Sequence, residues 1–161
     1  MTFDIRSLHR EDAADLCELL NHIIRLGGST AYEAEFSSKD FLEEFHEDPG
    51  VLGTLVAEHD GELCGFQTLH IVDATRLAIA SFADQRVRRP GVGRALFKES
   101  KKVAARYGAK TITAKIRADN IFGLRFYRGR GFKDVDVLKA VPLRDGTPVD
   151  RIVTVFDMKS A

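Results

Sequence analysis

The most informative segment of the chain is Arg88-Arg89-Pro90-Gly91-Val92-Gly93-Arg94-Ala95-Leu96. It follows an apolar run typical of a strand and opens a stretch with the apolar spacing of a helix. Its two glycines let the backbone turn tightly and approach a ligand closely. The first N–H groups of a helix are unpaired and carry a partial positive charge, and three arginines add charge-assisted donors. The segment therefore predicts a site for phosphate oxygens between a strand and a helix.

Two well-known phosphate-binding loops fit this segment poorly. A Walker A loop ends in Gly-Lys-Ser/Thr, whereas Gly93 is followed by Arg94 and Ala95. The dinucleotide fingerprint has a glycine or alanine where Leu96 stands, and it belongs to an early strand–helix–strand unit. Taken alone, the segment also fits a plain strand-to-helix turn with solvated arginines.

Upstream of this segment, apolar periodicity predicts two helices and four strands. The helices run over 11–26, closed by Gly27 and Gly28, and from Ser38, taken as the N-cap, to about residue 46. A first short strand lies near Phe3 and Ile5. The other three cover 51–58, 62–72 and 76–83, and Asp60-Gly61 between the first two of these is a strong hairpin signal.

Downstream, the pattern predicts two more helices, over 91–107 and 121–128, and strands over 111–116, 132–141 and 149–158. Gly108 is the expected C-cap of the longer helix. The resulting order is β-α-α-β-β-β-α-β-α-β-β. This order predicts an α/β fold with a mixed, partly antiparallel central sheet flanked by helices. No repeat or linker divides the chain, so we expect a single domain over residues 1–161.

Composition excludes several classes of protein. Lysine plus arginine number 24 and aspartate plus glutamate 24, which argues against a nucleic-acid-binding protein. Cys17 and Cys64 stand in apolar stretches, so we expect two buried thiols and no metal site. No segment resembles a signal peptide or a membrane span. We therefore expect a cytoplasmic protein without nucleic-acid or membrane partners.

A second informative segment lies about one strand after the first: Ala118-Asp119-Asn120-Ile121-Phe122-Gly123-Leu124-Arg125-Phe126-Tyr127-Arg128-Gly129-Arg130-Gly131-Phe132. Asn120 and Tyr127 are seven positions apart, so they share one face of the predicted helix. The simpler interpretation is that Asn120 is an N-cap and Tyr127 a packed aromatic residue.

Together the two segments resemble the GNAT N-acetyltransferase superfamily. The pattern Arg88-x-x-Gly91-x-Gly93 resembles its acetyl-CoA pyrophosphate loop, and Asn120, Tyr127 and Gly131-Phe132 resemble its second motif. Pro90 departs from the pattern, because it removes one N–H donor from the loop. The resemblance covers nearly the whole chain and implies that acetyl-CoA is bound by Phe82, Ala83, Arg88, Arg89, Pro90, Gly91, Val92, Gly93, Arg94, Asn120 and Tyr127.

The resemblance also implies direct attack of an amine on the acetyl thioester in a ternary complex. An N–H near Phe82 or Ala83 is expected to polarise the thioester carbonyl. Tyr127 is expected to supply the departing thiolate with a proton or a hydrogen bond. Many relatives carry a glutamate in the strand before the loop, but here that strand has no carboxylate. The candidates for the general base are therefore His70, Asp73, Glu33 and Glu35.

Within the superfamily the chain looks most like the phosphinothricin and methionine-sulfone acetyltransferase branch. The cues are Asn21-His22, Ser29-Thr30 and Val149-Asp150. This branch implies a small amino-acid-like acceptor, whose carboxylate would bind backbone amides or an arginine, for which Arg76, Arg117 and Arg151 are the candidates. Two alternatives stay open, a protein or peptide N-terminal acetyltransferase and a non-catalytic acyl-CoA-binding module. A homodimer through the last strands is expected by the same resemblance.

Overall fold

The computed structural model describes residues 1–160. Across these residues seven strands form one sheet in the order β1-β2-β3-β4-β5-β7-β6. The neighbouring pairs are antiparallel, except that β4 and β5 are parallel. This arrangement confirms the expected mixed sheet. The strands are β1 (Asp4–Ser7), β2 (Val51–His59), β3 (Glu62–Ile71), β4 (Arg76–Ala83), β5 (Thr111–Arg117), β6 (Lys133–Pro142) and β7 (Pro148–Asp157).

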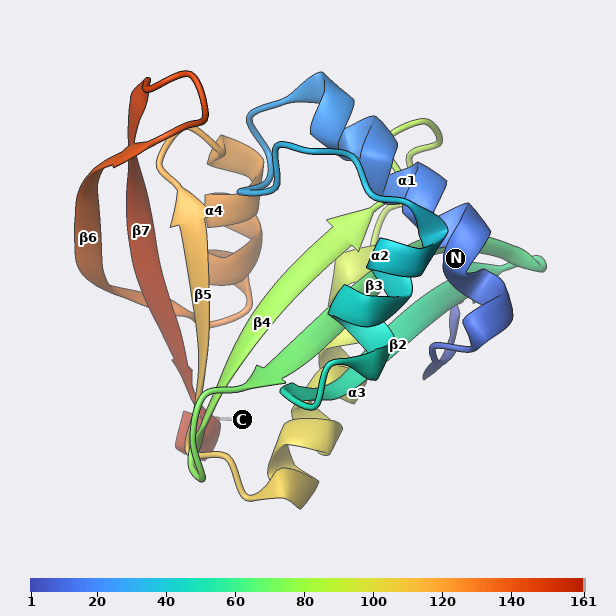
Figure 1. The fold of residues 1–161 in the computed structure, drawn as a ribbon. Helices are drawn as coiled ribbons and strands as arrows, with labels where there is room; N and C mark the ends of the chain where they lie inside the picture. Colours follow the sequence, from blue (N-terminus) through green and yellow to red (C-terminus); the bar gives the residue numbers. More distant parts are fainter. Residues whose placement is uncertain (161) are drawn as a thin grey trace.

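Helices cover both faces of the sheet (Figure 1). One face carries α1 (Ala13–Leu26) and α2 (Ser38–Leu42), which continues into a wider turn over Glu43–Glu47. The other face carries α3 (Val92–Tyr107) and α4 (Ile121–Gly129). Single 3-10 turns cover Arg10–Asp12 and Met158–Ser160. The observed order of helices and strands is the predicted one.

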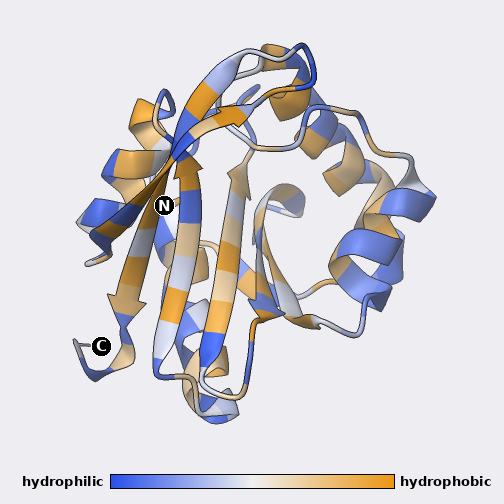
Figure 2. Ribbon diagram, turned by 60° about the vertical axis from the view of Figure 1, so that its left-hand side comes forward, coloured by the Kyte–Doolittle hydropathy of each residue, from blue (hydrophilic) through white to orange (hydrophobic). Residues whose placement is uncertain are grey.

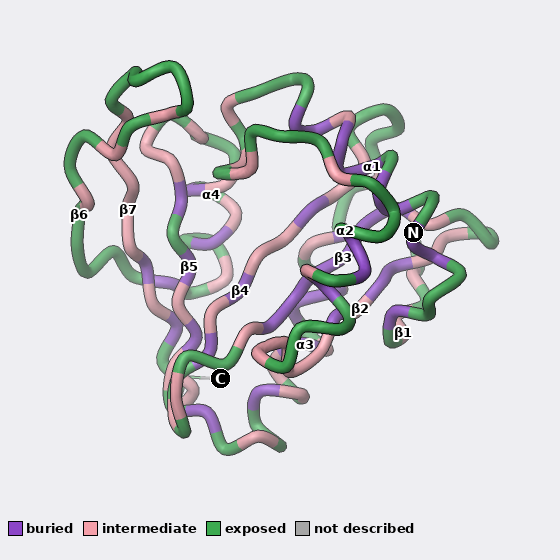
Figure 3. Tube along the Cα trace, viewed as in Figure 1, coloured by how far each residue is buried: buried purple, intermediate pink, exposed green. Residues whose placement is uncertain are grey.

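The two larger of three hydrophobic clusters lie on opposite sides of the sheet. Hydrophobic residues alternate with hydrophilic ones along the strands (Figure 2). Since successive side chains of a strand point to opposite faces of the sheet, one strand can contribute residues to both cores. The core under α1 and α2 contains Phe41, Phe45, Phe66 and Phe82, and the core under α3 and α4 contains Phe97, Tyr127, Phe132 and Phe156. The central strand β3 is mostly buried, whereas β6 at the sheet edge is mostly exposed (Figure 3).

Two predicted helix starts need correction. The second helix begins at Ser38, but its N-cap is Ser37, whose extended backbone lets Oγ accept a hydrogen bond from the Asp40 N–H at 3.0 Å. The first helix begins at Ala13, because Asp12 ends a 3-10 turn. There the Asp12 carboxylate accepts hydrogen bonds from the guanidinium of Arg6 and the N–H of His9.

Both cysteines are buried free thiols, as predicted. Within residues 1–160, no group of three or more histidine, cysteine, aspartate or glutamate side chains is arranged to hold a metal ion. The same residues include no helix with the length and apolar character needed to cross a bilayer.

The feature that positions the functional site is the divergence of β4 from β5. The two strands pair only from Arg76 to Ala78 on β4 and from Thr111 to Thr113 on β5. Beyond Ala78 they separate, as Figure 1 shows. The second half of β4 therefore has one edge without a neighbouring strand.

Candidate active site

A cleft of about 670 Å³ occupies the gap between β4 and β5. Its walls come from the ends of both strands, the loop between α1 and α2, the loop before α3 and the first turns of α4. Segments that are far apart in the sequence thus meet at one place. Of the predicted cofactor-binding residues, those that line the cleft are Phe82, Ala83, Arg88, Arg89, Pro90, Gly93, Asn120 and Tyr127.

The open edge of β4 offers backbone donors to this cleft. In the antiparallel ladder with β3, the N–H of Asp84 donates to the carbonyl of Cys64. The backbone N–H and C=O groups of the even-numbered residues of β4 therefore point toward β3. On the other side, the carbonyl of Thr75 accepts from the N–H of Lys110, so the backbone N–H and C=O groups of the odd-numbered residues point toward β5. The N–H of Ala83 therefore faces the cleft. The N–H of Phe82 belongs to the ladder with β3, which removes it as a candidate for polarising a carbonyl.

Two glycines shape the start of α3, each for a different reason. Gly91 caps the helix with φ +92°, a left-handed conformation that strains other residues. Gly93 lies under the ring of Phe126 from α4, and a Cβ atom there would stand 2.7 Å from Phe126 Cε1. The glycine pattern that predicted a phosphate loop thus also allows α4 to pack closely on α3.

The three arginines of the loop have different environments. Arg88 and Arg89 line the cleft, and the guanidinium of Arg89 is paired with Glu62. Arg94 is exposed on the first turn of α3 and does not line the cleft. Val92 is buried and packs in a cluster with Ala57, Cys64 and Leu96. Neither the side chain of Arg94 nor that of Val92 reaches the cleft, because the helical turn points them elsewhere.

Gln67 on β3 anchors the loop, and sequence reasoning missed it. The side chain is fully buried; Nε2 donates to the carbonyl of Gly93 at 3.2 Å, and Oε1 accepts from the hydroxyl of Ser100 at 2.8 Å. These bonds fix the first turn of α3 to the sheet. The available signal was a glutamine that directly follows the apolar run from Leu63 to Phe66 within the predicted strand.

Tyr127 projects from α4 into the inner end of the cleft. The residue is 6% exposed, and its hydroxyl donates a hydrogen bond to Oγ of Ser81 on β4 at 2.8 Å. Burial raises the pKa of the phenol to about 12. Tyr127 is therefore a neutral hydrogen-bond donor throughout the physiological pH range.

Asn120 is the N-cap of α4, which is the simpler of the two roles that its sequence position suggests. Its Oδ1 accepts from the N–H of Gly123 at 2.9 Å, so it is the N-cap of α4. Its Nδ2 donates to the carbonyl of Ser29 at 3.2 Å, which ties α4 to the loop between α1 and α2. A contact to a bound pantetheine arm stays a prediction.

The structure does not bring His70 and Asp73 into the cleft. His70 lies beside Ala78, and Asp73 lies in the turn before β4, where its carboxylate accepts hydrogen bonds from Thr75 and Arg76. These bonds lower the pKa of Asp73. Because β3 and β4 are antiparallel, the end of β3 lies beside the start of β4, whereas the cleft lies at the end of β4.

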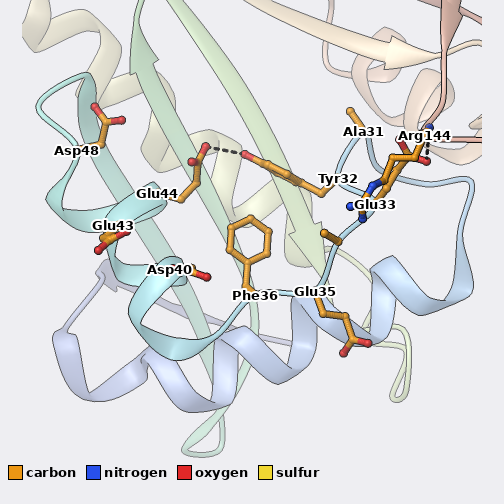
Figure 4. Close-up of a pocket in the computed structure, with 11 residues that line it drawn as sticks. Ala31, Tyr32, Glu33, Glu35, Phe36, Asp40, Glu43, Glu44, Asp48 and Arg144 are labelled. Carbon is orange, nitrogen blue, oxygen red and sulfur yellow. Dashed lines mark hydrogen bonds between the residues drawn. The ribbon is translucent and has the colours of Figure 1, made fainter.

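Glu33 and Glu35 line a second cavity of about 610 Å³ (Figure 4). Glu33 accepts from the backbone N–H of Arg144 at 3.1 Å, and Glu35 pairs with Arg25 at 2.6 Å. Tyr32 lies between the two cavities, lines both, and donates its hydroxyl to Glu44 at 2.9 Å. Neither predicted base therefore lines the cleft that holds Tyr127.

The cleft offers no free carboxylate among its described lining residues. Its only carboxylate is that of Asp84, which accepts hydrogen bonds from the backbone and guanidinium of Arg86. Burial opposes its ionisation, but the bonds from Arg86 lower the pKa of Asp84 on balance. An ionised, fully engaged carboxylate is a poor general base.

One of the three arginines considered for an acceptor carboxylate lines the cleft. It is Arg117, at the end of β5, whose Nε and Nη2 bond Asp119 at 2.9 and 2.7 Å. Arg76 pairs with Asp73 at the far end of β4, and Arg151 on β7 does not line the cleft.

Comparisons with known proteins agree with this architecture. The model of the acetyltransferase (GNAT) family matches residues 15–132. A search of curated proteins finds no significant match. Among solved structures, a Salmonella typhimurium protein described as an acetyltransferase with its cofactor acetyl-CoA is 18% identical, with TM-score 0.86 and coverage of 98% of this chain and 95% of that one.

Two further structures carry more specific names. A GNAT phosphinothricin acetyltransferase from Sinorhizobium meliloti, in complex with acetyl-CoA, has TM-score 0.84 at 18% identity, covering 98% of this chain and 89% of that one. A ribosomal-protein-alanine N-acetyltransferase from Brucella melitensis has TM-score 0.84 at 22% identity, covering 96% and 99%. At such identities the likeness shows the fold, while the family model covers most of the sequence. The chain therefore belongs to the GNAT family of acetyltransferases.

Proposed function

We propose that this protein transfers the acetyl group of acetyl-CoA to the primary amine of a small amino-acid-like molecule within one ternary complex. The observation that carries the proposal is the cleft between β4 and β5. It combines a free strand edge, a helix N-terminus rich in cations and a buried phenol. These are the parts needed to hold an amide-containing arm, a pyrophosphate and a thioester in one line.

The cleft fits acetyl-CoA by the chemistry of its walls. An extended chain with amide groups can pair with the open edge of β4, as an added strand does. Phosphate oxygens suit the first N–H groups of α3 beside Arg88. When bound, acetyl-CoA supplies an activated acetyl thioester. The protein's part is to orient it beside the acceptor amine.

Ala83 and Tyr127 are placed for the two charges that develop during transfer. The N–H of Ala83 faces the cleft and suits a carbonyl oxygen as it gains negative charge. Tyr127 suits the sulfur. Moving a proton from a phenol of pKa about 12 to a thiolate whose acid has a pKa of about 8.5 costs roughly 5 kcal/mol. Tyr127 therefore acts as a hydrogen-bond donor to the thiolate.

The acceptor binds on the β5 side of the cleft. Asp119 occupies Nε and Nη2 of Arg117, and no residue within 1–160 bonds Nη1, so Arg117 can still bind a carboxylate. Because no lining residue within 1–160 offers a free carboxylate, the amine loses its proton to water rather than to a side chain. The rate then follows the neutral fraction of the acceptor amine as pH rises.

A second candidate function is acetylation of peptide N-termini. It is favoured by the neighbouring cavity, whose carboxylates would suit basic residues that follow a peptide N-terminus. These carboxylates belong to Glu33, Glu35, Asp40, Glu43, Glu44 and Asp48. Tyr32 lines both cavities, so the two cavities adjoin at this residue.

A panel of acceptors separates the two functions. Release of CoA thiol from acetyl-CoA is followed with methionine sulfone, phosphinothricin, other free amino acids and short basic peptides. The proposal expects turnover with free amino acids, a raised KM when their carboxylate is amidated, and loss of that effect in Arg117→Leu. Turnover confined to peptides would move the assignment to the second function.

A further inference from the structure

Ser81 is the one polar side chain of β4 between Leu77 and Ala83. Strand alternation places it on the same face as Leu77 and Ile79, which pack with Tyr127 in the core under α3 and α4. Ser81 thus ends an apolar row at the point where the row meets the cleft. It is partly exposed and lines the cleft.

Ser81 holds the only hydrogen bond of the Tyr127 hydroxyl within residues 1–160. The phenol O–H donates to Oγ of Ser81 at 2.8 Å. The hydrogen of Ser81 itself has no acceptor among these residues. The Ser81 hydroxyl can therefore also act as the donor of this pair. If its hydrogen turns to the phenol oxygen, the phenol hydrogen becomes free to bond another acceptor.

We propose that Ser81 is the positioning residue of Tyr127, holding the phenol oxygen at the cleft wall and reversing the hydrogen bond so that Tyr127 donates to the departing sulfur. The inference rests on the proposed acetyl transfer. In that reaction the C–N bond forms, the C–S bond breaks with its electron pair left on sulfur, and the amine proton passes to water. Each hydroxyl keeps its own hydrogen; only the directions of the two hydrogen bonds change.

The reversal solves a conflict within the resting structure. A phenol has one hydrogen, and here that hydrogen is committed to Ser81. Turning it to sulfur without a replacement donor would leave the enclosed phenol oxygen without a partner, which is unfavourable for a buried polar group. A donor at Ser81 removes this penalty and strengthens the phenol as a donor, because hydrogen bonds in a chain polarise one another.

A purely structural role would be that Ser81 only satisfies a buried hydroxyl in the folded state. A double-mutant cycle separates the two roles. We expect Ser81→Ala to lower kcat about threefold to tenfold, the range of one neutral hydrogen bond, with the KM for acetyl-CoA unchanged. In the Tyr127→Phe background, Ser81→Ala should have no further effect on kcat. Ser81→Thr, which keeps the hydroxyl, should restore most of the rate lost in Ser81→Ala.

An unchanged kcat in Ser81→Ala would overturn the inference, as would an equal loss in both backgrounds. Neither result would touch the proposed function, because the wild-type protein would still acetylate its acceptor. If the wild-type protein transfers no acetyl group to any amine, the proposed function fails by itself.

The hydrogen bond is then tested without turnover. The chain has three tyrosines and no tryptophan, so fluorotyrosine labelling gives few ¹⁹F resonances, and Tyr127→Phe assigns one of them. Since a Ser81 donor stabilises the phenolate, we expect Ser81→Ala to raise the titration midpoint of that resonance. An unshifted midpoint would mean that Ser81 cannot donate to Tyr127.

Discussion

At the scale of the residue, the proposed chemistry depends on a phenol that stays protonated. Tyr127 is enclosed by Phe126 and Phe132 and bonded to Ser81. Burial disfavours the phenolate and raises the pKa of Tyr127 to about 12. The same shift makes Tyr127 a reporter of folding, because the unfolded chain has a phenol pKa near 10.

This shift predicts how stability depends on alkaline pH. Below about pH 10 both states keep the phenol proton; between about pH 10 and 12 the unfolded chain loses it first. The contribution of Tyr127 is thus complete below pH 10 and is lost as pH rises toward 12, by about 2 kcal/mol. Denaturant unfolding should show a shallower alkaline decline in Tyr127→Phe than in wild type. Equal declines would mean that the phenol titrates normally in the folded state.

At the scale of the element, the start of α3 is fixed from two sides. Gln67 on β3 bonds the carbonyl of Gly93 and the hydroxyl of Ser100, and Phe126 of α4 covers Gly93. The helix terminus that would receive phosphate is therefore held by both the sheet and the neighbouring helix. Such support keeps the unpaired N–H groups aimed at the cleft before any ligand arrives.

A methyl group at Gly93 should disturb this packing. In Gly93→Ala the new Cβ would meet Phe126 at 2.7 Å, so the ring or the helix must move. We expect the affinity for acetyl-CoA, measured by calorimetric titration, to fall about tenfold or more, as for lost helix-terminal contacts of 1–2 kcal/mol. Gly129→Ala in α4 is the matched control, since a Cβ there meets nothing within 4 Å. Equal affinities in the two variants would contradict the tight contact.

At the scale of the whole molecule, the cleft is bridged across its mouth. Asn120 bonds the carbonyl of Ser29, and Glu33 accepts from the backbone of Arg144, so the loop between α1 and α2 is joined to both α4 and the turn between β6 and β7. These contacts connect the N-terminal part of the sheet with its C-terminal part. Glu33 and Glu35 therefore line the second cavity, drawn in Figure 4, and not the cleft that holds Tyr127.

The placement of these carboxylates leads to a prediction about the general base. Glu33→Gln and Glu35→Gln should each keep kcat within about threefold of wild type and leave its pH profile unchanged, because neither side chain lines the cleft. Replacing a true general base should lower kcat about 100-fold or more. Steady-state rates at saturating acceptor across pH decide between these outcomes. A 100-fold loss in either variant would identify the base.

The sequence predicted the features that depend on local pattern. The glycine loop, the N-cap at Asn120 and the position of Tyr127 follow from residues close together in the chain, and the order of helices and strands follows from periodicity. Ser81 and Gln67 escaped notice because their partners, Tyr127 and Ser100, lie far along the chain.

The candidates for the general base also depend on strand pairing, which local sequence pattern does not give. His70 and Asp73 are candidates because residues toward the end of the run before β4 could reach the cleft, but antiparallel pairing places them near the start of β4, away from the cleft. Local pattern cannot say which end of a strand faces a cleft. That depends on where β4 leaves β5, which pairing across the sheet determines.

The most direct test of the proposed acetyl transfer is the rate at which CoA thiol is released from acetyl-CoA. This rate is compared between wild type and Tyr127→Phe in the presence of a free amino acid such as methionine sulfone. We expect acceptor-dependent release and a loss of about 10- to 100-fold in Tyr127→Phe, the range of a hydrogen bond to a charged group. Release that is equally fast in the variant would contradict the role of the buried phenol, and release with peptides alone would contradict the proposed acceptor.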